Sequence, residues 1–220
     1  MNWDALVLTL QIASASTVLS LLVGVPIAWW LARDNAWYRI VLSAAVMVPM
    51  VLPPTVLGYY LLQMFGRRSV LGEILENWLN MSLVFHWTGA ALAAFVVSAP
   101  FLIRAAQTGF ESTDRSYSEA ARTLGRSEVA IFFLISIPLA GRAILAGGAL
   151  ALARGLGEFG ATLMVAGNVP GKTQTMSIAI YDAVQTGKTS EANVLAITLS
   201  VAAIGLLTIV GLIGRNRLRL

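Results

Sequence analysis

The sequence predicts an all-α integral membrane protein, and two observations lead to this fold class. The 220 residues are 57% hydrophobic with a mean hydropathy of +0.76, and 12% are charged, whereas soluble domains carry about 25% charged residues. Apolar segments of about 20 residues recur along the chain, which is the length that a helix needs to cross the hydrocarbon core. Because lipid cannot satisfy free backbone groups, each such segment is expected to be a helix.

Five segments qualify as membrane spans: residues 6–32, 40–65, 87–103, 143–166 and 194–213. The third is shorter than the others but carries no charge, and flanking residues can complete it. A sixth, partial helix is predicted over residues 176–184 as an amphipathic surface helix. The whole chain, 1–220, is therefore expected to be one membrane domain with five spans.

The basic residues predict its orientation. Four of them, Arg67, Arg68, Lys172 and Lys188, fall on the side of the N-terminus, and Arg154 lies within a span. Ten fall on the opposite side: Arg33, Arg39, Arg104, Arg115, Arg122, Arg126, Arg142, Arg215, Arg217 and Arg219. Because cytoplasmic loops carry the excess of basic residues, the N-terminus is expected outside and the C-terminus in the cytoplasm. The pI of 9.9 then reflects membrane topology rather than nucleic-acid binding.

Several kinds of chemistry are not expected. The chain has no cysteine and one histidine, His86, which excludes disulfides, thiolate sites and His-rich metal clusters. No nucleophile–base pair is recognisable, so no catalytic residue, metal or cofactor is assigned to this chain. Residues 1–4 lack a basic region, so the first apolar segment is not expected to be a cleaved signal peptide.

A polar interruption at residues 111–138 is predicted to form a cytoplasmic helical hairpin. Ser116 and Glu119 have the spacing of a capping box. Gly125 stands where a left-handed residue would end the first helix, and Ser127 is placed to cap a second helix that Pro138 closes. The first helix carries an apolar stripe made of Tyr117, Ala120, Ala121 and Leu124. A loop of this kind can simply pack on its own membrane domain.

The spacing of this interruption adds a second interpretation. Glu119-Ala120-Ala121, three residues, Gly125, nine residues and Ile-x-apolar-Pro138 resemble the signature loop of ABC importer permeases. The one departure is Ile137, which replaces a leucine. In that family the loop is a coupling helix that docks in a cleft of the ATPase subunit.

Other segments are similar to the molybdate permease branch of this family. These are residues 50–60 (MVLPPTVLGYY), 66–68 (GRR), 157–162 (GEFGAT) and 168–173 (NVPGKT). The resemblance implies a homodimer, two cytoplasmic ABC ATPase subunits that use ATP-Mg, and an extracytoplasmic molybdate-binding protein. Sulfate and thiosulfate permeases are similar around Gly157 and Glu158, so a sulfate cargo stays open, as does tungstate. An ion-coupled secondary transporter is the alternative from another class, but it would be expected to show inverted repeats, and no second copy of the Glu119 pattern is found.

Two groups within the spans are candidates for the pathway. Pro53 and Pro54 break the second span and bend it, with Thr55 and Gly58 close by, and the bend serves either a gate or packing alone. Arg154 and Glu158 lie one helical turn apart, and charges at membrane depth need partners. We expect a structural or gating ion pair rather than direct anion binding, since Glu158 would repel an anion.

Residues 166–173 (AGNVPGKT) resemble a relaxed phosphate loop. A phosphate loop follows a strand and opens a helix, whereas this segment follows a predicted span, and Pro170 lacks a backbone donor. It is not expected to bind a nucleotide. The energy source is therefore expected in another polypeptide.

Overall fold

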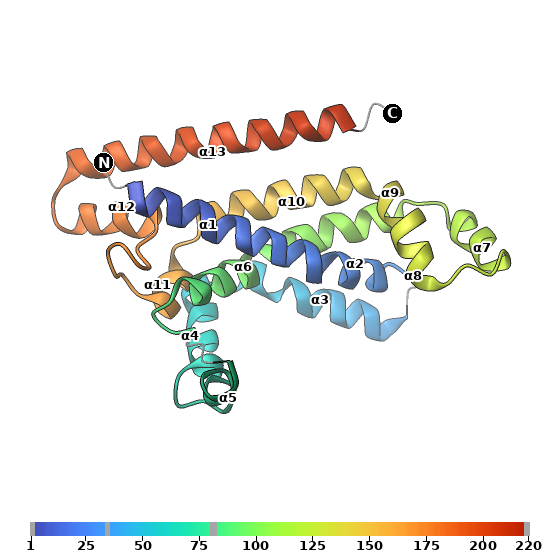
Figure 1. The fold of residues 1–220 in the computed structure, drawn as a ribbon, viewed down its shortest axis with the longest axis horizontal. Coiled ribbons are helices and arrows are strands. Elements are labelled where there is room, and N and C mark those ends of the chain that lie inside the picture. Colours follow the sequence, from blue (N-terminus) through green and yellow to red (C-terminus); the bar gives the residue numbers. More distant parts are fainter. Residues whose placement is uncertain (1–2, 34–35, 80–82, 218–220) are drawn as a thin grey trace.

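Apolar helices that run side by side make up most of the protein (Figure 1). The structure is a computed structural model, and it describes residues 3–33, 36–79 and 83–217. Within these ranges every regular element is helical. In chain order they are α1 (Trp3–Leu19), η1 (Ser20–Gly24), α2 (Val25–Leu31), α3 (Trp37–Val51), α4 (Pro54–Phe65), α5 (Val70–Leu79), α6 (Trp87–Glu111), α7 (Arg115–Thr123), α8 (Glu128–Ile131), η2 (Phe132–Ser136), α9 (Ile137–Leu139), α10 (Gly141–Leu156), α11 (Gly160–Ala166), α12 (Met176–Gln185) and α13 (Thr189–Arg217).

The first predicted span is one helix, Trp3–Leu31, of 29 residues. It contains the π-helical turn η1, which ends two residues before Pro26. Proline has no backbone N–H, so the Leu22 carbonyl cannot receive its usual α-helical hydrogen bond. A wider turn at this place accommodates the mismatch, and the helix continues without a sharp bend.

Helix α6 is the centre of the fold and packs against α10, α1, α11 and α2. Alanines that are fully buried, such as Ala93, Ala94 and Ala106, allow the neighbouring helices to approach closely. The helix ends at Glu111, well beyond the predicted end at residue 103. Its polar last turns remain ordered because Gln107 contacts the Ser43 hydroxyl at 3.1 Å and donates to Glu111 at 2.8 Å.

The second and fourth predicted spans are both broken. Residues 40–65 form α3 and α4, which meet at Pro53 and Pro54 with a bend of 111°, so the predicted proline bend is a complete break. The prediction of one helix over 143–166 is wrong, because α10 ends at Leu156 and α11 starts anew at Gly160. Helix α10 is instead continuous in sequence with the segment Glu128–Leu139, from which it is bent by 77°.

Different elements lie at the two ends of the molecule. Figure 1 shows the N-terminus, α11 and α12 at one end, and α7, α8 and the C-terminus at the other. Helix α12 confirms the predicted helix at 176–184, with Met176 and Ile178 buried. The last span, α13, lies along the outside, and 6% of its apolar window is buried in this chain. Arg219 of the charge count lies outside the described residues.

Candidate functional site

The first helix of the hairpin, α7, is capped by a residue that differs from the predicted one. Asp114 precedes the helix, and its Oδ1 accepts a hydrogen bond from the Ser116 backbone N–H at 2.9 Å. The predicted capping box is wrong, because Ser116 already lies inside the first turn. The hydrogen bonds that the Asp114 carboxylate accepts from Ser116 lower its pKa below the ordinary value.

The end of α7 is formed as predicted by Gly125. Its φ is 77°, in the left-handed region that glycine adopts without strain. The Gly125 N–H bonds to the Arg122 carbonyl at 2.9 Å, and the Arg126 N–H reaches back to the Ala121 carbonyl at 3.0 Å. These two bonds make a Schellman motif, which reverses the chain sharply after α7.

The predicted apolar stripe of α7 divides into an inner and an outer part. Ala121 is buried against the rest of the chain. Tyr117 and Leu124 are 57% and 82% exposed, and Ala120 is exposed between them. An apolar surface on an otherwise polar helix at the end of a membrane protein is typical of a binding surface.

The second helix of the hairpin is apolar and irregular. Ser127 caps it, as predicted, by accepting from the Ala130 N–H at 3.3 Å. The π-helical turn η2 then precedes Pro138, as η1 precedes Pro26. The helix ends at Leu139, one residue beyond Pro138.

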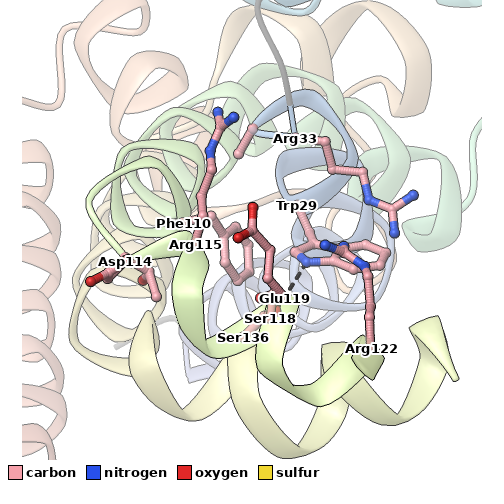
Figure 2. Close-up of a pocket in the computed structure, with 11 residues that line it drawn as sticks. Trp29, Arg33, Phe110, Asp114, Arg115, Ser118, Glu119, Arg122 and Ser136 are labelled. Carbon is pink, nitrogen blue, oxygen red and sulfur yellow. Dashed lines mark hydrogen bonds between the residues drawn. The ribbon is translucent and has the colours of Figure 1, made fainter. Parts of the chain in front are cut away.

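A cavity of about 170 Å³ lies between this hairpin and the end of the first span. Figure 2 shows Arg115, Ser118 and Glu119 of α7 around it, with Trp29 and Arg33 on the opposite side. The Trp29 indole N–H donates to the Ser136 hydroxyl at 3.1 Å, drawn as a dashed line in Figure 2. The predicted coupling-loop residue Glu119 therefore faces a polar cavity, while Tyr117 and Leu124 are exposed to solvent.

The predicted gate residues at the start of α4 lie against the start of α11, which follows the break after α10. A methyl group at Gly58 would lie 2.7 Å from Met164 Cβ and 2.9 Å from Ala161 Cα. A methyl group at Gly160 would lie 3.1 Å from Thr55 Cγ2. The starts of α4 and α11 therefore pack backbone against backbone through two glycines. Pro53 and Thr55 stay exposed in this chain.

Arg154 and Glu158 form the expected ion pair. The distance from an Arg154 guanidinium nitrogen to Glu158 Oε2 is 2.9 Å, and the Glu158 side chain is 1% exposed. The other carboxylate oxygen accepts from the Ala161 N–H at 2.8 Å. Glu158 thus compensates a cation with one oxygen and caps the first turn of α11 with the other, which explains why a new helix starts there.

A family model described as "Binding-protein-dependent transport system inner membrane component" matches residues 24–216. The chain belongs to this family. It is 41% identical over 208 residues to the molybdenum transport system permease protein ModB of Escherichia coli (strain K12), covering 94% of this chain and 91% of the relative. It is 40% identical over 181 residues, 82% of this chain and 80% of the relative, to the putative molybdenum transport system permease protein YvgM of Bacillus subtilis (strain 168). The resemblance predicted from the sequence is confirmed.

Solved structures show the same fold. A chain of the MetNI methionine ABC transporter matches with a TM-score of 0.71 at 18% identity, covering 100% of this chain and 95% of that chain. A chain of a bacterial ABC transporter for alginate import matches with a TM-score of 0.77 at 14% identity, covering 97% and 78%. The permease thus has the fold of ABC transporter membrane subunits, and its sequence relatives are transport permeases rather than enzymes.

The sequence does not predict the roles of three residues, two in the hairpin and one in the contact between α4 and α11. Asp114 caps α7 and has a residue type that is common at helix N-termini, whereas the predicted cap is Ser116. Gly160 lies in the segment 157–162, but its contact with Thr55 depends on a helix break that the sequence does not predict. Glu128, the first residue of α8, received no role, although its carboxylate contacts both Arg33 and Arg122. Asp114 carries a local signal, whereas the contacts of Gly160 and Glu128 are visible only in three dimensions.

The phosphate-loop-like segment folds as a closed turn. The Val169 carbonyl accepts from the N–H groups of Lys172, Thr173 and Gln174 at 3.0, 2.9 and 3.1 Å. Thr173 also accepts from the Val169 N–H at 3.1 Å through its hydroxyl. These donors are used inside the loop, so this conformation does not offer them to a phosphate.

Proposed function

We propose that this permease is the membrane-spanning subunit of an ATP-driven importer for molybdate. The observation that carries the proposal is the 41% identity over 208 residues to a molybdenum transport permease. Relatives from a bacillus and a haloarchaeon, at 40% and 38% identity, carry molybdenum transport names as well. Tungstate, another tetrahedral dianion, is proposed as a second cargo.

The proposed topology has five spans, with the N-terminus outside and the hairpin and C-terminus in the cytoplasm. Three helices are long and apolar enough to cross alone, and two bent pairs bring the total to five if each pair is one span. In the second pair, α10 is proposed to cross the membrane, with Glu128–Leu139 at its cytoplasmic end. The ten basic residues of the predicted cytoplasmic side include Arg115, Arg122 and Arg126 of the hairpin, at the end where Figure 1 places the C-terminus. This arrangement agrees with the positive-inside rule.

The proposed assembly contains two copies of the permease, two cytoplasmic ABC ATPase subunits and an extracytoplasmic molybdate-binding protein. The family description names transport systems that depend on a binding protein, and one structural neighbour was solved with a periplasmic binding protein. A second copy fits the exposed apolar surface around the α3–α4 break, where Val51 is 83% exposed beside Pro53. ATP-Mg is assigned to the ATPase subunits, and no cofactor or metal to this chain.

The proposed mechanism uses α7 as the coupling helix. Tyr117 and Leu124 form the surface that enters the ATPase cleft, and the Schellman turn at Gly125 fixes how the helix is presented. ATP binding would close the ATPases and displace α7, which would move the spans from an inward-facing to an outward-facing state. Hydrolysis would reset them. The transporter then alternates between two states that different ligands favour.

Uptake of labelled molybdate by proteoliposomes tests the function. The permease is reconstituted with its ATPase subunit and the binding protein is added outside, with ATP or ADP inside. We expect uptake with ATP only, unaffected by a large excess of sulfate. Competition by sulfate would reassign the cargo to sulfate, and uptake driven by an ion gradient without the ATPase would overturn the proposal in favour of a secondary transporter.

A further inference from the structure

The Glu128 carboxylate joins two cationic side chains from different parts of the chain. Its Oε1 accepts from Arg122 Nε at 2.7 Å, and Arg122 lies in the last turn of α7. Its Oε2 is paired with Arg33, which follows the end of the first span by two residues. One carboxylate therefore links the first span to both helices of the hairpin.

Trp29 makes the same connection through the neighbouring turn. Its ring lies 4.9 Å from that of Phe132 in η2, and its indole N–H donates to Ser136. The Arg33 guanidinium lies 4.2 Å from the centre of the Trp29 ring, close enough for a cation–π interaction. The end of the first span is thus held against the second helix of the hairpin by an ion pair, a hydrogen bond and an aromatic contact.

The π-helical turn explains why these contacts coincide. Because Pro138 cannot donate to the Leu134 carbonyl, the helix widens over Phe132–Ser136. Phe132 and Ser136 are both buried and both contact Trp29. The sequence therefore places an irregular turn at the point where the hairpin meets the first span.

These ion pairs are expected to add little to the free energy of unfolding. The side chains of Arg33, Glu128 and Arg122 are 32%, 45% and 46% exposed, and ion pairs this exposed contribute little. A shared carboxylate does fix relative positions, however. Without its charge, Arg33 and Arg122 would lose the anion that they share.

We propose that Glu128 is a positioning residue that makes the first span move together with the coupling helix. This inference rests on the proposed function and deepens it. When the ATPases displace α7, the Arg122–Glu128–Arg33 link carries the displacement to the α1–α2 helix, in addition to the covalent route through α10. The first span packs along both α6 and α10, so the force reaches the core of the subunit from two sides.

The test measures molybdate molecules transported per ATP hydrolysed, in the proteoliposomes described above. Glu128→Gln keeps the shape of the side chain and removes its charge. We expect this ratio to fall about tenfold while the ATPase subunits still co-purify with the permease. The matched control is Glu191→Gln, which removes an exposed pair with Lys188 at 3.8 Å elsewhere and is expected to leave the ratio unchanged. An unchanged ratio in Glu128→Gln would overturn the inference.

A rescue experiment separates a positional role from a merely structural one. The chain has no cysteine, so Arg33→Cys with Glu128→Cys introduces the only two thiols. The double variant is expected to be uncoupled, and a short reversible bifunctional thiosulfonate should restore coupling until a reductant removes it. A bridged protein that stays uncoupled or is arrested would show that α7 must move relative to the first span, against the proposal.

The outcomes for the inference and for the function are distinct. If the wild-type complex shows no ATP-dependent molybdate uptake, the proposed function fails. If the wild-type complex transports and Glu128→Gln transports with the same ratio, only the role of Glu128 fails.

Discussion

At the end that carries α7, partly exposed charged side chains and the half-buried ring of Trp29 join the hairpin to the first span, as in the contacts of Arg33 with Glu128 and Trp29. At the opposite end, α4 and α11 pack against each other through glycines such as Gly58, and the almost fully buried carboxylate of Glu158 links Arg154 of α10 to the start of α11. A few side chains hold the hairpin to the first span, so the two can be displaced together, whereas backbone contact and buried charge at the other end resist displacement. One end of the permease is therefore suited to be displaced, and the other to hold its geometry.

The largest expected effect tests the buried charge. Arg154→Met leaves Glu158 without its cation in a site that is 1% exposed, and breaking a buried pair from one side costs about 3 kcal/mol. We expect a clear loss of thermal stability in detergent. Lys188→Met, which removes an exposed pair at 3.8 Å, is the control and should change stability by less than about 1 kcal/mol. Equal losses in both variants would mean that the buried pair stabilises the fold no more than an exposed pair does.

The second effect tests the glycine contact. In Gly58→Ala the new methyl group would lie 2.9 Å from Ala161 Cα and 2.7 Å from Met164 Cβ, so α4 and α11 must separate. Overpacking of this kind costs about 2 kcal/mol. Gly205→Ala is the control, because the new methyl group in α13 would have no atom from outside its own stretch of helix within 4 Å. This variant should be neutral or slightly stabilising. Both are measured by thermal unfolding, and a neutral Gly58→Ala would mean that the two helices are not held rigidly.

The third effect concerns the hairpin. Gly125→Val places a β-branched side chain at a φ of 77°, a strain of about 1–2 kcal/mol that should be relieved by reshaping the turn after α7. We expect normal membrane insertion and loss of coupling between ATP hydrolysis and transport, measured with co-purification of the ATPase as a control. Gly141→Val is the matched control, because a Cβ at this position would have no neighbouring atom within 4 Å and the φ of Gly141 is not positive. This variant should retain coupling. Coupling retained in both variants would reduce Gly125 to an ordinary loop residue.

The smallest effect is the pH dependence of the α7 cap. The Asp114 pKa is lowered from 3.8 by the hydrogen bonds from Ser116. A carboxyl group whose folded pKa lies below its unfolded pKa stabilises the folded state above the unfolded value, and this contribution is lost as pH falls through the folded value. Hydrogen exchange of α7 amides in Asp114→Ala should exceed that of wild type near neutral pH. The difference should shrink below pH 3.8, and a difference that persists there would point to a cause other than the charge.

The hairpin was largely predictable because its signals are local. The left-handed Gly125, the cap at Ser127 and the end near Pro138 each follow from residues within one turn. Even the error at Ser116 is a shift of two residues between neighbouring cap candidates. The apolar spans were predictable for the same reason, since length and composition decide them.

The break between α10 and α11 was not predictable from local signals. Residues 143–166 are apolar enough for one span. The local hints of a break are Gly157 and Glu158, and the predicted ion pair with Arg154 already accounts for Glu158. Helix α10 ends at Leu156, and Glu158 caps the start of α11 by accepting a hydrogen bond from the Ala161 N–H. The new direction is fixed by contact of Gly160 with Thr55, more than 100 residues earlier in the chain. Likewise, the Arg33–Glu128 contact spans 95 residues. Pairings at such separations leave no mark in a single sequence.

The two π-helical turns, Ser20–Gly24 and Phe132–Ser136, have a consequence for how chain length can vary. One residue added to or removed from a regular helix rotates everything beyond it by about 100°, which turns a lipid-facing surface toward the core. A π-helical turn already holds one residue more than an α-helical turn, so removal of that residue would restore a regular helix there. Single-residue length differences among related permeases should therefore concentrate at these two turns and be absent from the middle of α6.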